Sequence, residues 1–257
     1  MNRPYPPRRI RALLAGFGTT TLHPRNPWTV MFFAFSFPGF GYLMLQRYLA
    51  AFLFIVWEMF INTKAKINSG ILYTLLGDFD KAREVMDERW LILYVTIYLF
   101  NIWDSYRLCT DLNKQYLLAE REKAPIENFK MTPLDINFMD KKQPWLAFWW
   151  SFFAPGVGHL YIHKFLTGLF ISGAMMVLMY YSRIPQGMHF TAAGDFAGAK
   201  RVLDMQWAMY LPSMYAFIVY DAYDSAVEQN KLFETEQSEF LRRQYLHPSF
   251  PMPLRER

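Results

Sequence analysis

Residues 27–43 read PWTVMFFAFSFPGFGYL, and residues 144–160 read PWLAFWWSFFAPGVGHL. Both stretches begin with Pro-Trp and contain a P-G-x-G run. At the same offset of 117 positions, residues 27–114 align with residues 144–231 without a gap, and 25 of the 88 aligned residues are identical. Self-similarity at one fixed offset is the signature of an internal repeat. The sequence therefore predicts two tandem copies of one structural unit.

The distribution of charge along the chain points to a lipid environment. Only 19% of the 257 residues are charged, against about a quarter in an ordinary soluble domain, while 53% are hydrophobic and 19% aromatic. A helix needs about 20 apolar residues to cross a bilayer, and about 17 can suffice. Apolar windows with at most one acidic or basic residue lie at 26–46, 48–63, 90–103, 143–163, 165–182 and 205–220. This pattern predicts an all-α, polytopic membrane protein; the alternative is a soluble protein with buried helices.

The repeat and the charged blocks divide the chain into five parts. Each repeat is expected to hold a helix, the P-G-x-G turn, a second helix, an amphipathic loop and a third helix ending at a D-x-Y sequence. The predicted parts are a basic cytoplasmic segment (1–26), membrane repeat 1 (27–114), a charged linker (115–143), membrane repeat 2 (144–231) and a charged tail (232–257).

The P-G-x-G runs are the candidate turn sites. Proline removes a helix hydrogen bond, and glycine relieves backbone sterics where a chain bends. The first apolar segment of each repeat is therefore expected to re-enter and return to the same face, with a kinked continuous span as the alternative. The turn residues are Pro38, Gly39, Gly41, Pro155, Gly156 and Gly158.

Counting basic residues separates these two topologies. If the first segments return, 19 Lys and Arg lie inside and 8 outside; if they span, the counts are 16 and 11. Cytoplasmic loops carry an excess of Lys and Arg. The count favours four crossings in a cell membrane, with both termini cytoplasmic.

The stretch from P-G-x-G to D-x-Y resembles the TM2-domain and related small bacterial membrane proteins. The second copy carries the fuller pattern, whereas Tyr42 and Met44 replace the expected His and Tyr in the first copy. The resemblance implies a membrane architecture and no shared catalytic activity. The matching residues of the second copy are Pro155, Gly156, Gly158, His159, Tyr161 and Gly168.

Polar residues inside or beside the apolar windows are the other candidates. Glu58 lies within a window, which makes it a functional hypothesis by default, although Met175 replaces it in the second copy. The two aspartates of D-x-Y are expected to hold the turn or cap the next helix, with an ion relay as the alternative. The D-x-Y residues are Asp104, Tyr106, Asp221 and Tyr223.

Enzyme motifs are missing from the sequence. His159 and His163 lie four apart, a spacing that places both imidazoles on one helix face, but no third metal ligand is evident. There is no G-x-S-x-G elbow, Walker loop or H-E-x-x-H sequence. No metal or cofactor is predicted, and the sequence argues against an enzyme without deciding the question.

These features favour a non-enzymatic membrane scaffold or accessory subunit. Its expected partners are the lipid bilayer and a membrane protein, a cytoplasmic protein or a second copy of the chain, and not nucleic acid. The alternative is a small transporter or channel with a pathway between the two repeats. A third hypothesis, an enzyme acting on lipid, would depend on His159.

Overall fold

The computed structural model describes residues 7–15, 18–131, 133 and 136–245, and these are mostly helical. The helices are α1 (Pro27–Ser36), α2 (Phe40–Met44), α3 (Tyr48–Ala65), α4 (Ile67–Leu75), α5 (Phe79–Val85), α6 (Glu88–Arg121), α7 (Pro144–Phe153), α8 (Val157–Tyr161), α9 (Phe165–Ser182), α10 (Ile184–Ala192), α11 (Phe196–Val202), α12 (Met205–Ala208) and α13 (Leu211–Tyr245). Two antiparallel hairpins pair β1 (Ala12–Ala15) with β2 (Gly18–Thr21) and β3 (Phe129–Met131) with β4 (Ile136–Phe138).

Helices of the two halves occur in matching pairs. Each of α1 to α5 begins and ends 117 residues before its counterpart among α7 to α11. Helix α6 is continuous, whereas the matching part of the second half is interrupted and forms two helices, α12 and α13. Pro212 stands at this break, where Val95 occupies the matching place in α6. Proline cannot donate a backbone hydrogen bond and clashes with the preceding helical turn, which accounts for the interruption.

The first segment of each half turns back on itself. Helix α1 runs antiparallel to α6. At the start of α1, Trp28 packs against Tyr106, and near its end the Phe35 carbonyl accepts from the hydroxyl of the earlier α6 residue Tyr98. Beyond the P-G-x-G turn, α2 reverses direction, and Gln46 bonds to Thr21 ahead of α1. A helix of ten residues is about 15 Å long, half of what a bilayer core requires. The first segment therefore does not continue as one kinked helix but turns back at P-G-x-G.

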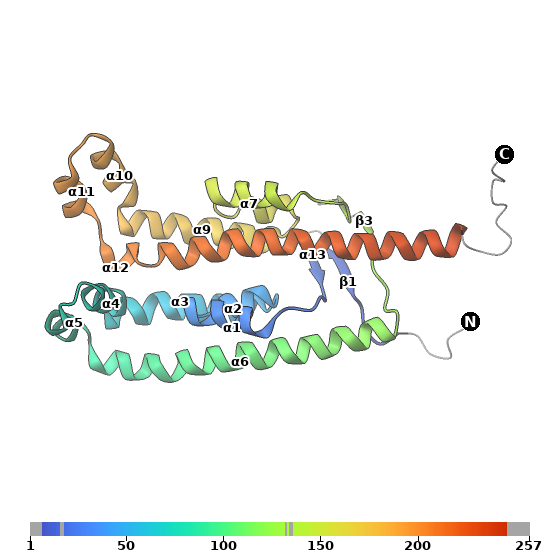
Figure 1. The fold of residues 1–257 in the computed structure, drawn as a ribbon, viewed down its shortest axis with the longest axis horizontal. Helices are drawn as coiled ribbons and strands as arrows, with labels where there is room; N and C mark the ends of the chain where they lie inside the picture. The colour runs from blue at the N-terminus through green and yellow to red at the C-terminus, as the bar shows by residue number, and fades with distance from the viewer. Residues whose placement is uncertain (1–6, 16–17, 132, 134–135, 246–257) are drawn as a thin grey trace.

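The long helices α3, α6, α9 and α13 lie side by side along the long axis of the molecule (Figure 1). Helices α4, α5, α10 and α11 gather at one end, and the hairpins lie toward the other. Aromatic side chains fill the contact between the halves. Phe40 stacks on Phe217 with ring centroids 4.1 Å apart, and Phe52 stacks on Phe170 at 4.0 Å. The two halves therefore share one core.

Two predicted boundaries were wrong. The D-x-Y sequences do not end their helices: α6 continues to Arg121 and α13 to Tyr245. Helix α5 ends at Val85, and Asp87 caps the next helix by accepting from the amides of Arg89 and Trp90. Asp78 and Asp195 cap α5 and α11 in the same way. Neither hairpin was predicted. Residues 1–6 and 246–257, part of the predicted terminal segments, lie outside the described residues.

Two of the described helices, α3 and α9, are long and apolar enough to cross a membrane by length and composition. Each has 18 residues, and only a third of each is buried inside the protein. The core helix of a soluble protein would instead be mostly buried. Each of these helices therefore has one buried side, and its exposed residues include large apolar ones such as Leu53 and Val56 in α3 and Leu169 and Met176 in α9.

Candidate functional site

Buried charges meet at one end of the helical body. We use the name charge cluster for Arg25, His159, Lys164, Asp221 and Asp224. The Asp221 side chain is only 1% exposed; its Oδ2 lies 3.2 Å from His159 Nε2 and 3.8 Å from Lys164 Nζ. Arg25 lies 3.6 Å from Asp221 and 2.6 Å from Asp224. Each charge in the cluster therefore has an opposite charge nearby, as buried ions require.

The cluster connects both halves of the molecule. Arg25 precedes α1, whereas the other four members come from α8, the α8–α9 connection and α13. Asn113 of α6 holds the Arg25 backbone from both sides, accepting from its amide at 3.0 Å and donating to its carbonyl at 2.7 Å. One arginine thus bridges α6 to α13.

Electrostatics fix the protonation of the cluster. Burial alone would raise the pKa of Asp221, but Lys164, His159 and Arg25 together hold it well below its usual range. Burial lowers the pKa of Lys164, an effect that Asp221 opposes. Burial lowers the pKa of the neighbouring His23 well below the usual range of histidine, and Arg25 and Lys164 lower it further. His23 is therefore neutral at pH 7.

The His23 environment predicts a loss of stability on mild acidification. Because the folded-state pKa of His23 lies below its unfolded value, the unfolded chain binds the proton first as the pH falls below about 6.5. We expect the thermal unfolding midpoint in detergent to fall from pH 7.5 to 5.5. His23→Gln should make this slope shallower, and His189→Gln, at an exposed position, is the matched control. An unchanged slope in His23→Gln would contradict the assignment.

The first half repeats the aspartate contact with different chemistry. Tyr42 and Asp104 occupy the places of His159 and Asp221, and the Tyr42 hydroxyl donates to Asp104 Oδ2 at 2.8 Å. In each half the aspartate therefore holds the first helical turn after P-G-x-G, and it lies in mid-helix instead of acting as a cap. Asp104 also pairs with Arg107, which is half exposed. The Arg107 side of this pair is therefore open to solvent, whereas the Asp104 side chain is only 13% exposed.

The tyrosines of D-x-Y pack on the tryptophans of Pro-Trp. The ring centroids of Tyr106 and Trp28 are 5.4 Å apart, and those of Tyr223 and Trp145 are 5.2 Å apart. Edge-to-face aromatic pairs at such distances are favourable beyond the area that they bury. The two motifs singled out in the sequence thus contact each other within each half.

Glu58 belongs to a second buried cluster, the amide network, together with Asn62, Asn68 and Gln206. Glu58 is 3% exposed, and its Oε1 accepts from Asn62 at 2.8 Å. Asn62 also donates to Asn68 at 3.1 Å and accepts from Gln206 at 2.8 Å. The network joins α3 and α4 of the first half to α12 of the second. Sequence reasoning missed its three amides, although they stand within or beside apolar windows.

The two histidines do not form a pair. Helix α8 ends at Tyr161, and His163 follows with a φ of 57°, so His163 is not on the helix face of His159. The His163 ring instead packs near Phe138 and Phe165. Among the described residues, no group of three or more His, Cys, Asp or Glu side chains is arranged to hold a metal ion.

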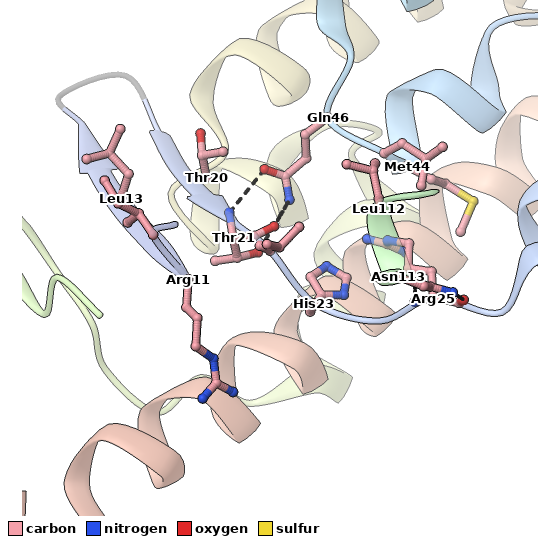
Figure 2. Close-up of a pocket in the computed structure, with 13 residues that line it drawn as sticks. Arg11, Leu13, Thr20, Thr21, His23, Arg25, Met44, Gln46, Leu112 and Asn113 are labelled. Atoms are coloured by element: carbon pink, nitrogen blue, oxygen red, sulfur yellow. Dashed lines mark hydrogen bonds between the residues drawn. The ribbon is translucent and has the colours of Figure 1, made fainter. Parts of the chain in front are cut away.

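A pocket of about 320 Å³ lies beside the charge cluster (Figure 2). Its wall joins the first hairpin to α2 and α6, with Gln46 bonded to Thr21 on one side and His23 and Asn113 on another. Leucine, isoleucine and methionine side chains also line it, together with Arg11 and Arg25. Charged, polar and apolar side chains therefore share the lining of the pocket.

Known proteins offer no counterpart from which a role could be transferred. No protein-family model, no curated protein and no solved structure matches this chain.

Proposed function

We propose that the protein is a cell-membrane scaffold or accessory subunit that crosses the bilayer four times, with both termini cytoplasmic. The proposed crossings are α3, residues 90–103 of α6, α9, and residues 205–220 of α12 and α13. An 18-residue helix is about 27 Å long, close to the thickness of a hydrocarbon core. The count of basic residues favours the same four crossings.

Outward-facing apolar side chains support the membrane assignment. Soluble monomers rarely expose contiguous apolar patches larger than a few hundred Å². Here large apolar side chains are exposed along α1, α3, α6, α7 and α9. They include Phe32 and Phe35, Leu53 and Val56, Ile92 and Leu99, Trp149 and Phe153, and Leu169 and Met176.

The turns have the internal hydrogen bonds that a bilayer demands. Unpaired backbone groups are costly in lipid, so irregular backbone must be satisfied within the protein. In the first half, Asn101 accepts from the Gly39 amide at 3.2 Å and donates to the Ala34 carbonyl at 2.9 Å. In the second half, the Ser172 hydroxyl donates to the Pro155 carbonyl at 2.9 Å. Both turns are therefore suited to membrane depth.

Cysteine labelling tests the proposed topology. In a Cys109→Ser background, single cysteines replace the exposed residues Leu76 and Ala193 near α4 and α10, and Lys123 and Gln237 at the other end. We expect a membrane-impermeant maleimide to label the first pair in intact cells and the second pair only after lysis. Labelling of Lys123→Cys from outside would contradict the four-crossing arrangement.

The scaffold role depends on one observation: α6 extends well past α1, α2 and α3, and α13 extends well past α7 and α9 (Figure 1). By helix rise, α6 continues about 26 Å beyond Asp104, and α13 about 36 Å beyond Asp221. These extensions are charged, yet they also expose Leu117 and Phe240. Exposed apolar side chains rimmed by charge are typical of protein-binding surfaces.

Photo-crosslinking in cells tests the scaffold role. Benzoylphenylalanine at Leu117 or Phe240 is expected to give discrete crosslinked species, whereas the same probe at Leu76, at the opposite end of the molecule, should not give them. Leu117→Lys combined with Phe240→Lys should abolish co-purification of the partner in mild detergent without lowering the unfolding midpoint. A chain that remains monomeric and uncrosslinked at both positions would refute the role.

A transporter or channel is the second candidate, because the amide network places the Glu58 carboxyl within a proposed crossing. Polar groups inside membrane helices commonly mark transport pathways. Against it, the stacked Phe40 and Phe217 rings fill the core between the halves. Ion flux into liposomes that Glu58→Gln reduces would place transport ahead of the scaffold role.

A further inference from the structure

The β3–β4 hairpin exposes its apolar face. Its register pairs Phe129 with Phe138 and Met131 with Ile136, so these four side chains lie on one side of the two strands. All four are exposed, Met131 to 66%. Hairpins in water normally turn such a face toward a core. This one turns it outward.

The opposite face of the hairpin makes the contact with the protein. Asn137 is 2% exposed, and its amide donates to the Ala15 carbonyl at 3.0 Å and to the Thr19 hydroxyl at 3.2 Å. The orientation of the hairpin is thus fixed by polar bonds to the first hairpin. A one-residue slip in register would exchange the two faces, so these bonds also keep the apolar side chains outward.

The exposed face continues the apolar surface of the proposed crossings. The Phe138 ring lies 6.5 Å from the His163 ring, which lies 5.7 Å from the ring of Phe165 at the start of α9. The next residue along α9, Leu166, is itself exposed. Aromatic side chains at the end of a crossing are suited to the membrane interface.

Basic side chains lie around this face. Lys142 Nζ lies 5.7 Å from the Phe138 ring, although its side chain is only 12% exposed. Lys141 is 61% exposed and pairs with Glu234 at 2.7 Å. Cationic side chains beside exposed aromatic ones match an anionic lipid surface, which attracts Lys and Arg by about 1 kcal/mol each. A second protein would leave unexplained why this face adjoins the start of α9.

We propose that the β3–β4 hairpin is a lipid-binding device that lies in the headgroup layer of the cytoplasmic leaflet. Phe129, Met131, Ile136 and Phe138 insert at the boundary with the acyl chains, and the exposed Lys141 lies on the side of the anionic headgroups. The proposal rests on the membrane placement of α9. It assigns a membrane contact to a segment between the repeats that does not cross the bilayer.

Spin labels in nanodiscs test this contact. The Cys109→Ser chain carries one label at a time at Met131 or Phe129, at Lys130 on the opposite face, or at Leu169 on the exposed side of α9. Nanodiscs contain phosphatidylcholine with or without phosphatidylglycerol, and power saturation compares collisions with oxygen and with a water-soluble nickel chelate. We expect labels at Met131 and Phe129 to favour oxygen, as Leu169 does, and the label at Lys130 to favour nickel.

The label at Leu169 distinguishes failure of the hairpin contact from failure of the membrane placement of α9. If Leu169 favours oxygen while Met131 and Phe129 both favour nickel, the hairpin contact is refuted and the membrane placement stands. If Leu169 also favours nickel, the membrane placement itself fails. A preference at Met131 that strengthens with phosphatidylglycerol supports the role of Lys141. If the preference is the same in both nanodiscs, Lys141 does not contribute, and the contact depends on the apolar side chains alone.

Discussion

Gly156→Ala is expected to destabilise the protein by about 3 kcal/mol, which combines backbone strain with overpacking. Gly156 has a φ of 96°, in the left-handed region that side chains disfavour. A Cβ there would also collide with the Ser172 hydroxyl and the Gly168 carbonyl. Neither group can easily move, because the Ser172 hydroxyl is bonded to the turn itself and the carbonyl is backbone.

Two other glycines divide this effect into its parts. Gly194 has a φ of 80° with nothing within 4 Å of an added Cβ, so Gly194→Ala should cost only the backbone strain, about 1–2 kcal/mol. Gly173 has open space and lies inside α9, so Gly173→Ala should be neutral or stabilising by up to about 1 kcal/mol. In one detergent, the thermal unfolding midpoint should be lowest for Gly156→Ala, intermediate for Gly194→Ala and highest for Gly173→Ala. Equal midpoints for Gly156→Ala and Gly194→Ala would show that the turn is not tightly packed.

The turn itself could be predicted from the sequence, because proline and glycine act through local sterics that do not depend on distant residues. The structure adds what lies against each turn. Gly156 approaches Gly168 and Ser172, two small residues four positions apart on α9. In the first half, Gly39 approaches Ala51 and Ile55 instead.

The length of the third helix could not be read from its polarity. Asp104 marks the point where apolar residues give way to charged ones, but a change in polarity is not a helix stop. Residues 104–121 contain neither glycine nor proline, and Ser105, Cys109 and Ala119 keep a buried stripe on α6. The helix therefore continues until the chain approaches Pro125.

The two buried clusters lay beyond sequence reasoning for a different reason. Gln206 reaches Asn62 across 144 residues, and Arg25 reaches Asp224 across 199. The residues that match Gln206 and Asn62 in the other half are Arg89 and Met179, so the repeat offers no second copy of this contact. Such contacts depend on how the halves pack, which periodicity and spacing do not encode.

Asp221→Asn is expected to destabilise the protein by about 3–5 kcal/mol, the cost of leaving buried charges without their partner. Lys164 and Arg25 would remain buried, and only Asp224 and the Ser225 hydroxyl would still contact them. Asp104→Asn is the matched control in the first half. Its partner Arg107 is half exposed and can be hydrated, so that variant should lose about 1 kcal/mol or less.

Removing the stranded charge should restore much of the lost stability. Lys164→Met alone leaves Asp221 with His159 and Arg25, and the double variant Asp221→Asn with Lys164→Met removes an opposite pair. Because a buried pair replaced by neutral groups can be close to neutral in stability, the double variant should be more stable than Asp221→Asn. Unfolding midpoints of the four proteins form a double-mutant cycle. If the double variant is as unstable as the sum of the single variants, Asp221 and Lys164 do not stabilise each other.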